Sequence, residues 1–178
     1  EDAARAVAGV TNTEGAETGW SRAEIAIAAT NGLARNYSTS SHSLAASVLA
    51  GEGTDMERDY DYTSAVYYSD LEDPAEIGRN AGERAVKRLN AQKVKTQQVP
   101  VIYDPRVSGG LIRHYAGGIN GSSITRGTSF LKDSMGKKIF SDGVNIIDDP
   151  HRPRGFRSKP FDGEGLANKR SAIADNGV

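Results

Sequence analysis

Residues 22–68 have the character of β-strands, and their first part alternates with a period of two, the spacing of a strand whose faces meet different surroundings. In the clearest stretch, residues 22–29, Ala23, Ile25 and Ile27 alternate with charged or small residues. Asn31-Gly32 follows at once, and this dipeptide is typical of a type I′ hairpin turn. The pattern therefore predicts a β-hairpin, the strongest constraint that this sequence places on its fold.

Three further strands extend the hairpin. We expect the return strand through Leu33, Arg35 and Tyr37, a third strand over residues 44–50, and a fourth over residues 56–62. Consecutive strands joined by short connections usually pair as neighbours. The sequence thus predicts a four-stranded antiparallel meander, preceded in residues 1–21 by a short helix and a loop.

Two helices are marked by the same N-terminal signal, an aspartate followed by proline, at residues 73–74 and 104–105. Aspartate is a good N-cap, and proline suits the first helical position. Glu76 also stands where a capping box has its acid. Each helix carries an apolar stripe, and the two stripes consist of Ile77, Ala81, Ala85 and Leu89, and of Val107, Leu111, Tyr115 and Ile119.

The second half of the chain mixes short elements. We expect a buried strand over residues 99–103, a helical segment over 122–135, and a hairpin whose strands, 139–140 and 144–147, flank Asp142-Gly143. Residues 148–178 are rich in glycine, proline and charge, which favours loops. The predicted fold class is α+β: an antiparallel β-meander plus helix, then a mixed helix and short-strand lobe, divided into residues 1–21, 22–95 and 96–178.

Composition narrows the class of protein. Leu, Ile, Val and Phe number only 34 of 178 residues, but the net charge is −1, so we expect a folded chain with a small core that buries further surface against a partner. The absence of cysteine excludes disulfides, thiol nucleophiles and cysteine-ligated zinc. No apolar run approaches the ~20 residues of a membrane span, and no signal peptide is recognisable. We expect a cytoplasmic protein and a sequence that lacks at least one genuine end.

Charge divides unevenly between the two halves. Residues 1–90 carry 8 basic and 15 acidic side chains, and residues 91–178 carry 14 and 8. This asymmetry suits attraction between lobes or between chains. The basic charges of the second half are dispersed among acids, so they favour solvated surface over nucleic-acid binding.

Generic catalytic motifs are absent. The sequence contains no P-loop, no G-x-S-x-G, and no pair of histidines at zinc-binding spacing. Asp148-Asp149 with His151 could bind a divalent ion, but a polar turn ended by Pro150 is the favoured interpretation. Gly109-Gly110 and Gly117-Gly118 indicate either close approach of a ligand or simple helix punctuation. No catalytic or metal-binding residue is predicted.

Residues 152–165 form the most unusual stretch, with four cations within eight positions and then two acids among glycines. Such a loop is either functional or solvated surface, and the residues alone leave both open. As the rim of a peptide site, Arg154 and Arg157 would face carboxylates, and Asp162 and Glu164 would face cations or amides.

This region resembles the TldD/PmbA family, once described as modulators of DNA gyrase. The resemblance rests on residues 144–150, 154–159 and 160–165, and extends upstream through residues 101–105 and through Arg126-Gly127-Thr128-Ser129-Phe130. It covers nearly the whole chain from about residue 20. It adds Arg126 to the candidates for peptide or partner binding.

The family has two branches whose products pair into a cytoplasmic proteolytic complex acting on unfolded peptides or peptide-antibiotic precursors. The TldD branch has a zinc-binding H-E-x-x-x-H just before the Arg-Gly-Thr-Ser stretch, a motif that would fall on residues 112–117 here. Neither histidine position is histidine, and Arg113 occupies the glutamate position. The chain therefore resembles the PmbA (TldE) branch.

The resemblance implies a non-catalytic subunit, with no cofactor of its own, that supports a zinc-bearing TldD-like paralogue and contacts its peptide substrate. A homodimer is a further option for its assembly. The alternative function is a regulatory binding protein that modulates DNA gyrase, which rests on the family's historical name. A peptidase active alone would need ligands that this chain lacks.

Overall fold

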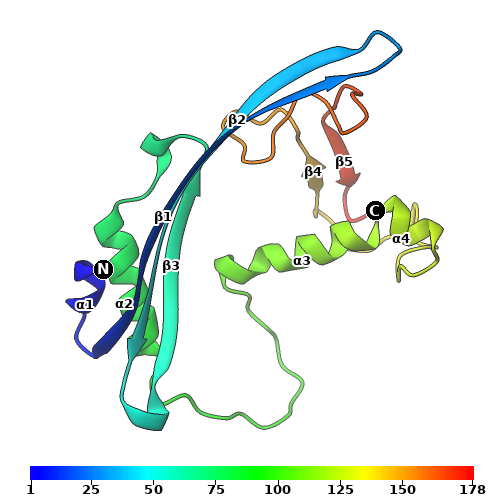
Figure 1. Cartoon of the computed structure of the whole chain (residues 1–178). Helices are drawn as coiled ribbons and strands as arrows, with labels where there is room; N and C mark the ends of the chain where they lie inside the picture. Colours follow the sequence, from blue (N-terminus) through cyan, green and yellow to red (C-terminus); the bar gives the residue numbers. More distant parts are fainter. The chain divides into compact units, whose positions relative to one another are not determined.

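The computed structural model describes all residues 1–178, which divide into two compact units (Figure 1). The first unit comprises Glu1–Lys93 and Asp149–Arg170, and the second comprises Val94–Asp148 and Ser171–Val178. The chain thus leaves the first unit, builds most of the second, and returns to the first before its last eight residues. No helix has the length and apolar character that crossing a membrane requires.

A three-stranded antiparallel sheet, in the order β1-β2-β3, forms the first unit. Its strands are β1 (Val10–Ala28), β2 (Ala34–Ala50) and β3 (Glu57–Ala65). The meander is confirmed, but the four-strand count is wrong, because the predicted second and third strands are one continuous strand, β2. The predicted loop before residue 22 is also wrong, since β1 pairs with β2 from Val10↔Ala50 to Ala28↔Ala34. Pairing along this whole length keeps polar Ser and Thr residues extended.

The hairpin turn differs from the predicted type I′. Gly32 has the positive φ expected of it, +87°, but Asn31 does not. The Gly32 amide donates to the Ala29 carbonyl, and the Ala29 amide donates to the Leu33 carbonyl, at 3.1 and 3.0 Å. The connection is therefore a three-residue loop of the kind in which a left-handed residue closes the turn.

Helix α2 (Pro74–Lys87) covers one face of the sheet. Its predicted cap is confirmed, because the Asp73 carboxylate accepts hydrogen bonds from the amides of Ala75 and Glu76 at 2.7 and 3.2 Å. The predicted apolar stripe is also confirmed and forms the core with α1 (Asp2–Arg5) and β2. The buried members of this core are Ala4, Ala46, Val48, Ala50, Ile77, Ala81 and Ala85.

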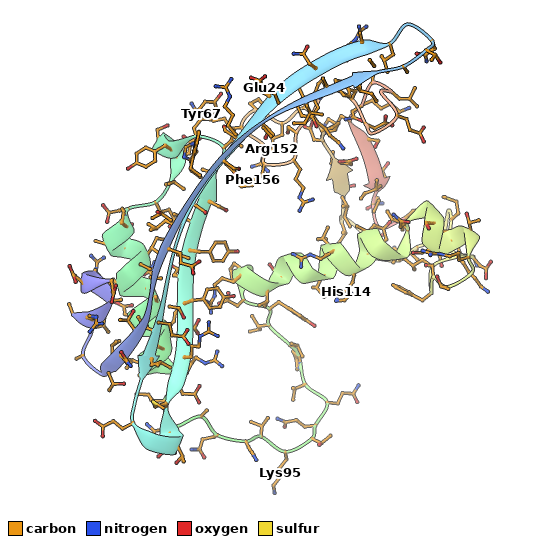
Figure 2. All side chains as sticks on the ribbon, in the orientation of Figure 1. Glu24, Tyr67, Lys95, His114, Arg152 and Phe156 are labelled. Atoms are coloured by element: carbon orange, nitrogen blue, oxygen red, sulfur yellow. The ribbon has the colours of Figure 1, made fainter.

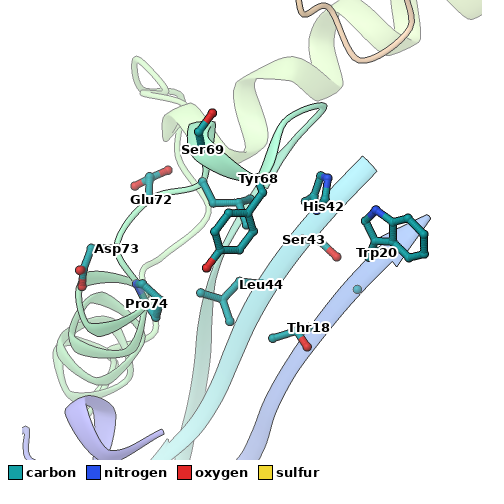
Figure 3. A pocket seen from close by; sticks show the side chains of 12 residues that line it. Thr18, Trp20, His42, Ser43, Leu44, Tyr68, Ser69, Glu72, Asp73 and Pro74 are labelled. Carbon is teal, nitrogen blue, oxygen red and sulfur yellow. The ribbon is translucent and has the colours of Figure 1, made fainter. Parts of the chain in front are cut away.

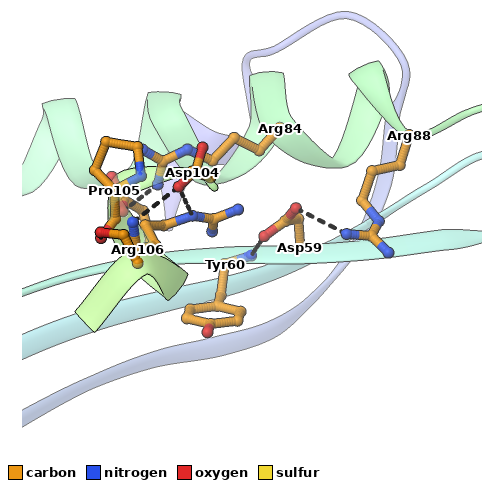
Figure 4. A network of polar contacts seen from close by, with 9 residues as sticks. Asp59, Tyr60, Arg84, Arg88, Asp104, Pro105 and Arg106 are labelled. Atoms are coloured by element: carbon orange, nitrogen blue, oxygen red, sulfur yellow. Dashed lines mark hydrogen bonds and ion pairs between the residues drawn. The ribbon is translucent and has the colours of Figure 1, made fainter. Parts of the chain in front are cut away.

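Ion pairs complete the same interface between the helix and β3. Asp59 and Asp61 are 5% and 7% exposed on the strand face that meets α2. Arg84 pairs with Asp61, and Arg88 approaches Asp59 at 3.5 Å (Figure 4). A spacing of two on a strand and of four on a helix brings the acids and bases into register.

The opposite face of the sheet carries polar and aromatic side chains. Tyr60 and Tyr62 stack there with ring centroids 6.2 Å apart. The Ser47 hydroxyl donates to the Glu14 carboxylate at 2.6 Å, and Arg58 pairs with the same group. The Ser47 hydrogen bond, followed by Arg58, lowers the pKa of Glu14 from its ordinary value.

The second unit is built from helices α3 (Pro105–Gly118) and α4 (Gly121–Thr125) and a two-stranded sheet, β4 (Ile146–Asp148) with β5 (Ser171–Ala174). The Asp104 cap is confirmed by its 2.9 Å bond from the Arg106 amide. The strand predicted over residues 99–103 is wrong, because this segment is irregular and Ile102 is 95% exposed. The hairpin around Asp142-Gly143 is wrong as well, since β4 pairs with β5 instead.

A small core holds the second unit together around Tyr115, Leu131 and Ala174. Tyr115 is the only buried side chain of the predicted α3 stripe, and its hydroxyl donates to the Ile173 carbonyl at 2.7 Å. The buried Ser129 hydroxyl donates to the Gly118 carbonyl at 2.5 Å and accepts from the Leu131 amide at 2.9 Å. Helix formation is confirmed over residues 121–125 only, so the predicted segment 122–135 is mostly loop.

Candidate peptide-binding surfaces

The loop of residues 152–165 belongs to the first unit and is fixed at its end by two apolar contacts. Phe161 is 6% exposed and meets the Tyr37 ring of β2 edge-on, with centroids 5.2 Å apart. A side chain at Gly165, where φ is +83°, would fall 2.1 Å from a Leu33 methyl carbon. Glycine therefore suits this position, because another residue would be strained by the positive φ and would displace the Leu33 side chain.

Arg154 is held inside the first unit. Its guanidinium pairs with Asp70 of the short 3-10 helix η2 (Tyr68–Asp70) and lies 4.6 Å from the centre of the Tyr67 ring. Its backbone takes φ +56°, a conformation that a residue without special contacts rarely adopts. Figure 2 labels Tyr67, Arg152 and Phe156, which mark this end of the loop. Arg154 therefore fastens the loop to the segment of residues 67–70, which follows the sheet.

Asp162 also has a partner within the loop. Its carboxylate accepts hydrogen bonds from the amides of Glu164 and Leu166, each at 2.9 Å. This arrangement shapes the turn at residues 162–166, as Asx side chains commonly do. One oxygen of the Asp162 carboxylate is thus already hydrogen-bonded to the backbone of its own loop.

The remaining predicted site residues have few or no side-chain partners within the chain. The side chains of Arg157 and Glu164 are exposed and make no hydrogen bond or ion pair within the chain. Arg126 lies in the second unit, where its Nε donates to the Ser122 carbonyl at 3.2 Å and the rest of its guanidinium is open. Arg157, Glu164 and Arg126 therefore remain the candidates for an external ligand.

An apolar groove in the second unit was not predicted. It has a volume of about 520 Å³ and is lined by residues of α3, the loop after α4, and β5. Met135 stands at it with 98% of its surface exposed, opposite the core residues Tyr115 and Leu131. The groove depends on β5, whose composition gave no strand signal, and this explains why the sequence did not reveal it.

The positions where the TldD branch has its zinc motif lie on α3. Ile112, Arg113 and Gly117 occupy its three ligand and base positions, and all three are exposed. His114 lies on the exposed side of the same helix (Figure 2). Across residues 1–178, no three His, Cys, Asp or Glu side chains are grouped so that they could share a metal ion. The residues at this position do not fit a zinc centre.

The Asp148-Asp149 turn behaves as the favoured interpretation expects. The Asp149 carboxylate accepts from the His151 amide at 3.2 Å and approaches Arg170 at 3.6 Å. These contacts close a polar turn.

Two family models match consecutive parts of the chain: the PmbA/TldA metallopeptidase central domain over residues 1–89 and the PmbA/TldA metallopeptidase C-terminal domain over residues 96–178. The chain belongs to the PmbA/TldD family.

Relatives and solved structures agree with this assignment. Metalloprotease PmbA of Escherichia coli O157:H7 is 38% identical over 169 residues, which are 95% of this chain and 38% of that protein. The PmbA homologue of Haemophilus influenzae is 38% identical over 83% of this chain and 33% of its own length. The chain thus spans about a third of the length of these relatives.

The fold itself recurs in crystal structures. A candidate modulator of DNA gyrase from Bacteroides thetaiotaomicron matches 99% of this chain and 42% of its own, with a TM-score of 0.87 and 29% identity. TldE from Thermococcus kodakarensis matches 92% of this chain and 37% of its own, with a TM-score of 0.75 and 22% identity. The second match shows the fold alone.

Proposed function

We propose that this chain is part of a PmbA/TldE-type subunit that has no metal site of its own, pairs with a zinc-bearing TldD-like paralogue, and helps to hold an extended peptide for cleavage. The observation that carries the proposal is the chemistry of α3 at residues 112–117. An isoleucine, an arginine and a glycine stand where two histidines and a glutamate would be needed, and none of them binds zinc in proteins.

The second unit supports a role in peptide binding. Its apolar groove is large enough for one or two side chains, and β5 is paired with only one strand, β4. A strand with one unpaired edge can accept an extended peptide through backbone hydrogen bonds, while a neighbouring pocket selects its side chains. Met135 is a suitable lining residue because its flexible thioether adapts to different partners.

Assembly is the first test. The full-length subunit should co-purify with its H-E-x-x-x-H paralogue, and elemental analysis should find zinc in the pair and none held tightly by the subunit alone. Replacing the paralogue's motif glutamate with glutamine should abolish cleavage by the pair without separating it. Stoichiometric zinc in the isolated subunit, or cleavage by that subunit alone, would contradict the proposal. Mass measurement of the isolated subunit decides whether it also forms a homodimer.

The loop provides the second test. Because Arg157 and Glu164 have no partners within the chain, Arg157→Gln with Glu164→Gln should leave the melting temperature unchanged and lower peptide cleavage by the assembled pair. Asp162→Ala is the matched contrast: it removes two hydrogen bonds to backbone amides and should cost about 1 kcal/mol of stability.

Each outcome of the loop test has a separate meaning. Lower cleavage with normal assembly assigns Arg157 and Glu164 to the peptide site. Weaker assembly makes the loop part of the subunit interface. Unchanged cleavage and assembly would show that the loop is solvated surface.

A further inference from the structure

A second hollow lies in the first unit, beside the N-terminus of α2. It has a volume of about 520 Å³ and is bounded by strands β1 and β2 and by the segment that precedes the helix (Figure 3). Trp20 and Tyr68 stand at it with 70% and 75% of their surfaces exposed. Large aromatic side chains left this open around a hollow are typical of sites that bind a partner.

The walls of the hollow combine aromatic, aliphatic and acidic groups. His42 meets the Tyr68 ring edge-on at 6.0 Å between centroids, and Leu44 and Pro74 supply aliphatic surface. Glu72 and Asp73 are its only charged lining residues, and no lysine or arginine is among them. The Asp73 carboxylate is already bound to helix amides, whereas the Glu72 carboxylate has no partner within the chain.

The residues next to the hollow in the sequence already hold an arginine side chain. Tyr67 and Asp70 together hold the guanidinium of Arg154, with the ring beneath it and the carboxylate paired to it. Tyr68 and Glu72 repeat this combination, a tyrosine followed shortly by an acid, and they line the hollow. Tyr67 and Asp70 hold the chain's own arginine, whereas Tyr68 and Glu72 have no cation of the chain bound to them.

We propose that this hollow binds an arginine side chain presented by a partner polypeptide. The guanidinium stacks on Tyr68 and pairs with Glu72, while the aliphatic stem lies against Leu44 and Pro74 (Figure 3). Arginine suits the site better than lysine because its planar guanidinium both stacks on aromatic rings and pairs with carboxylates. The excess of acidic side chains in residues 1–90, 15 against 8 basic, adds attraction for a cationic ligand. This inference uses none of the residues of the proposed peptide site and stands apart from it.

The single tryptophan makes the site directly observable, because Trp20 is the only tryptophan among the 178 residues and lines the hollow. Titration of the chain with N-acetyl-arginine amide at constant ionic strength should give a saturable change in tryptophan fluorescence. N-acetyl-citrulline amide has the same shape without the charge and should bind up to about fivefold more weakly, the factor expected when one exposed ion pair is lost.

Variants locate the binding within the hollow. Glu72→Gln should weaken the arginine probe about fivefold and leave the citrulline probe unchanged. Tyr68→Leu should weaken both probes, because both planar groups lose their stacking surface. Glu76→Gln is the matched control, an exposed acid in the first turn of α2 outside the lining, and should change neither. Circular dichroism melting establishes that each variant remains folded.

Three outcomes would overturn the proposal. The first is the absence of a saturable response to the arginine probe. The second is equal affinity for arginine and citrulline, which would mean that charge plays no part. The third is tighter binding of N-acetyl-leucine amide than of the arginine probe, which would identify the hollow as a site for an apolar side chain.

Discussion

Each unit has a small buried core, and the two cores are stabilised by different kinds of contact. In the first, alanine and isoleucine of α2 pack against β2 while the α2 glycines lie against the segment of α1, and seven apolar residues are buried there. In the second, the buried apolar core consists of Tyr115, Leu131 and Ala174, and hydrogen bonds from Tyr115 and Ser129 to carbonyl groups tie the loops together. Small side chains allow dense packing without bulk, whereas a loop-rich unit depends on a few polar anchors and leaves apolar surface open for ligands.

The largest expected effect concerns the core of the first unit. Ile77 is 1% exposed, so Ile77→Ala should cost about 3 kcal/mol through lost burial and the cavity left behind. Leu131 borders the open groove, so Leu131→Ala should cost only about 2 kcal/mol, the low end for a buried leucine. Hydrogen exchange of α2 and α3 amides measures each unit separately. If Ile77→Ala lowered protection in α3 as much as in α2, the units would unfold as one body.

Glycines in α2 and α3 test whether the first unit is more closely packed than the second. A Cβ at Gly82 of α2 would lie 2.8 Å from Val7 Cγ2 and 3.0 Å from the Ala4 carbonyl oxygen, so Gly82→Ala should push α1 away and cost about 1–2 kcal/mol.

Gly109 of α3 is the matched control, because a Cβ there meets nothing within 4 Å. Gly109→Ala should therefore stabilise α3 by up to ~1 kcal/mol through helix propensity. Thermal unfolding followed by circular dichroism measures both variants, and destabilisation by Gly109→Ala would show that α3 is closely packed at that point.

The hairpin turn of the first unit provides a smaller effect. Gly32 has φ +87°, so Gly32→Val should cost at least ~1 kcal/mol because a β-branched residue resists positive φ. Gly32→Asn should be milder, since asparagine tolerates this region. Chemical denaturation monitored through Trp20 reports on the same hairpin. Equal stability of the valine variant and the parent would contradict the turn geometry.

The smallest effect is pH-dependent and lies on the uncovered face of the sheet. The Ser47 hydrogen bond and then Arg58 lower the pKa of Glu14 below its ordinary value of 4.5, so ionised Glu14 stabilises the folded state above that value. This contribution is lost as the pH falls through the lowered pKa. Glu14→Gln should therefore be slightly less stable than the parent at neutral pH, and the difference should shrink in acid. Glu17→Gln is the control, and urea midpoints across the pH series measure both.

Local signals in the sequence were sufficient for several elements. The Asp-Pro caps located α2 and α3 because N-cap and proline preferences act within one turn of helix. The apolar stripe of α2 identified its buried face, and of the two residues predicted to take positive φ, Asn31 and Gly32, only Gly32 does so. The family is recognisable from short motifs, because their order and spacing along the chain are properties of the sequence itself.

Other elements depend on partners far away in the chain. Residues 10–21 contain glycine, threonine and glutamate without a strand pattern, yet they are extended because β2 supplies their hydrogen bonds. β5 exists because it pairs with β4, 23 or more residues earlier. The strand predicted over residues 56–62 is present, but its sequence does not indicate which face is buried. The buried face is the one that carries the aspartates, because Arg84 and Arg88 pair with them.

The candidate sites show the same division. Sequence alone selected Arg126, Arg154, Arg157, Asp162 and Glu164 as a charged set. The tertiary structure distinguished their roles, because Arg154 is bound to Asp70 and Tyr67, and Asp162 to backbone amides, while Arg157 and Glu164 are free. Residue type and spacing determine which charged groups the chain has. Whether such a group is already paired depends on contacts between distant segments, such as residues 67–70 and Arg154, and only folding brings these segments together.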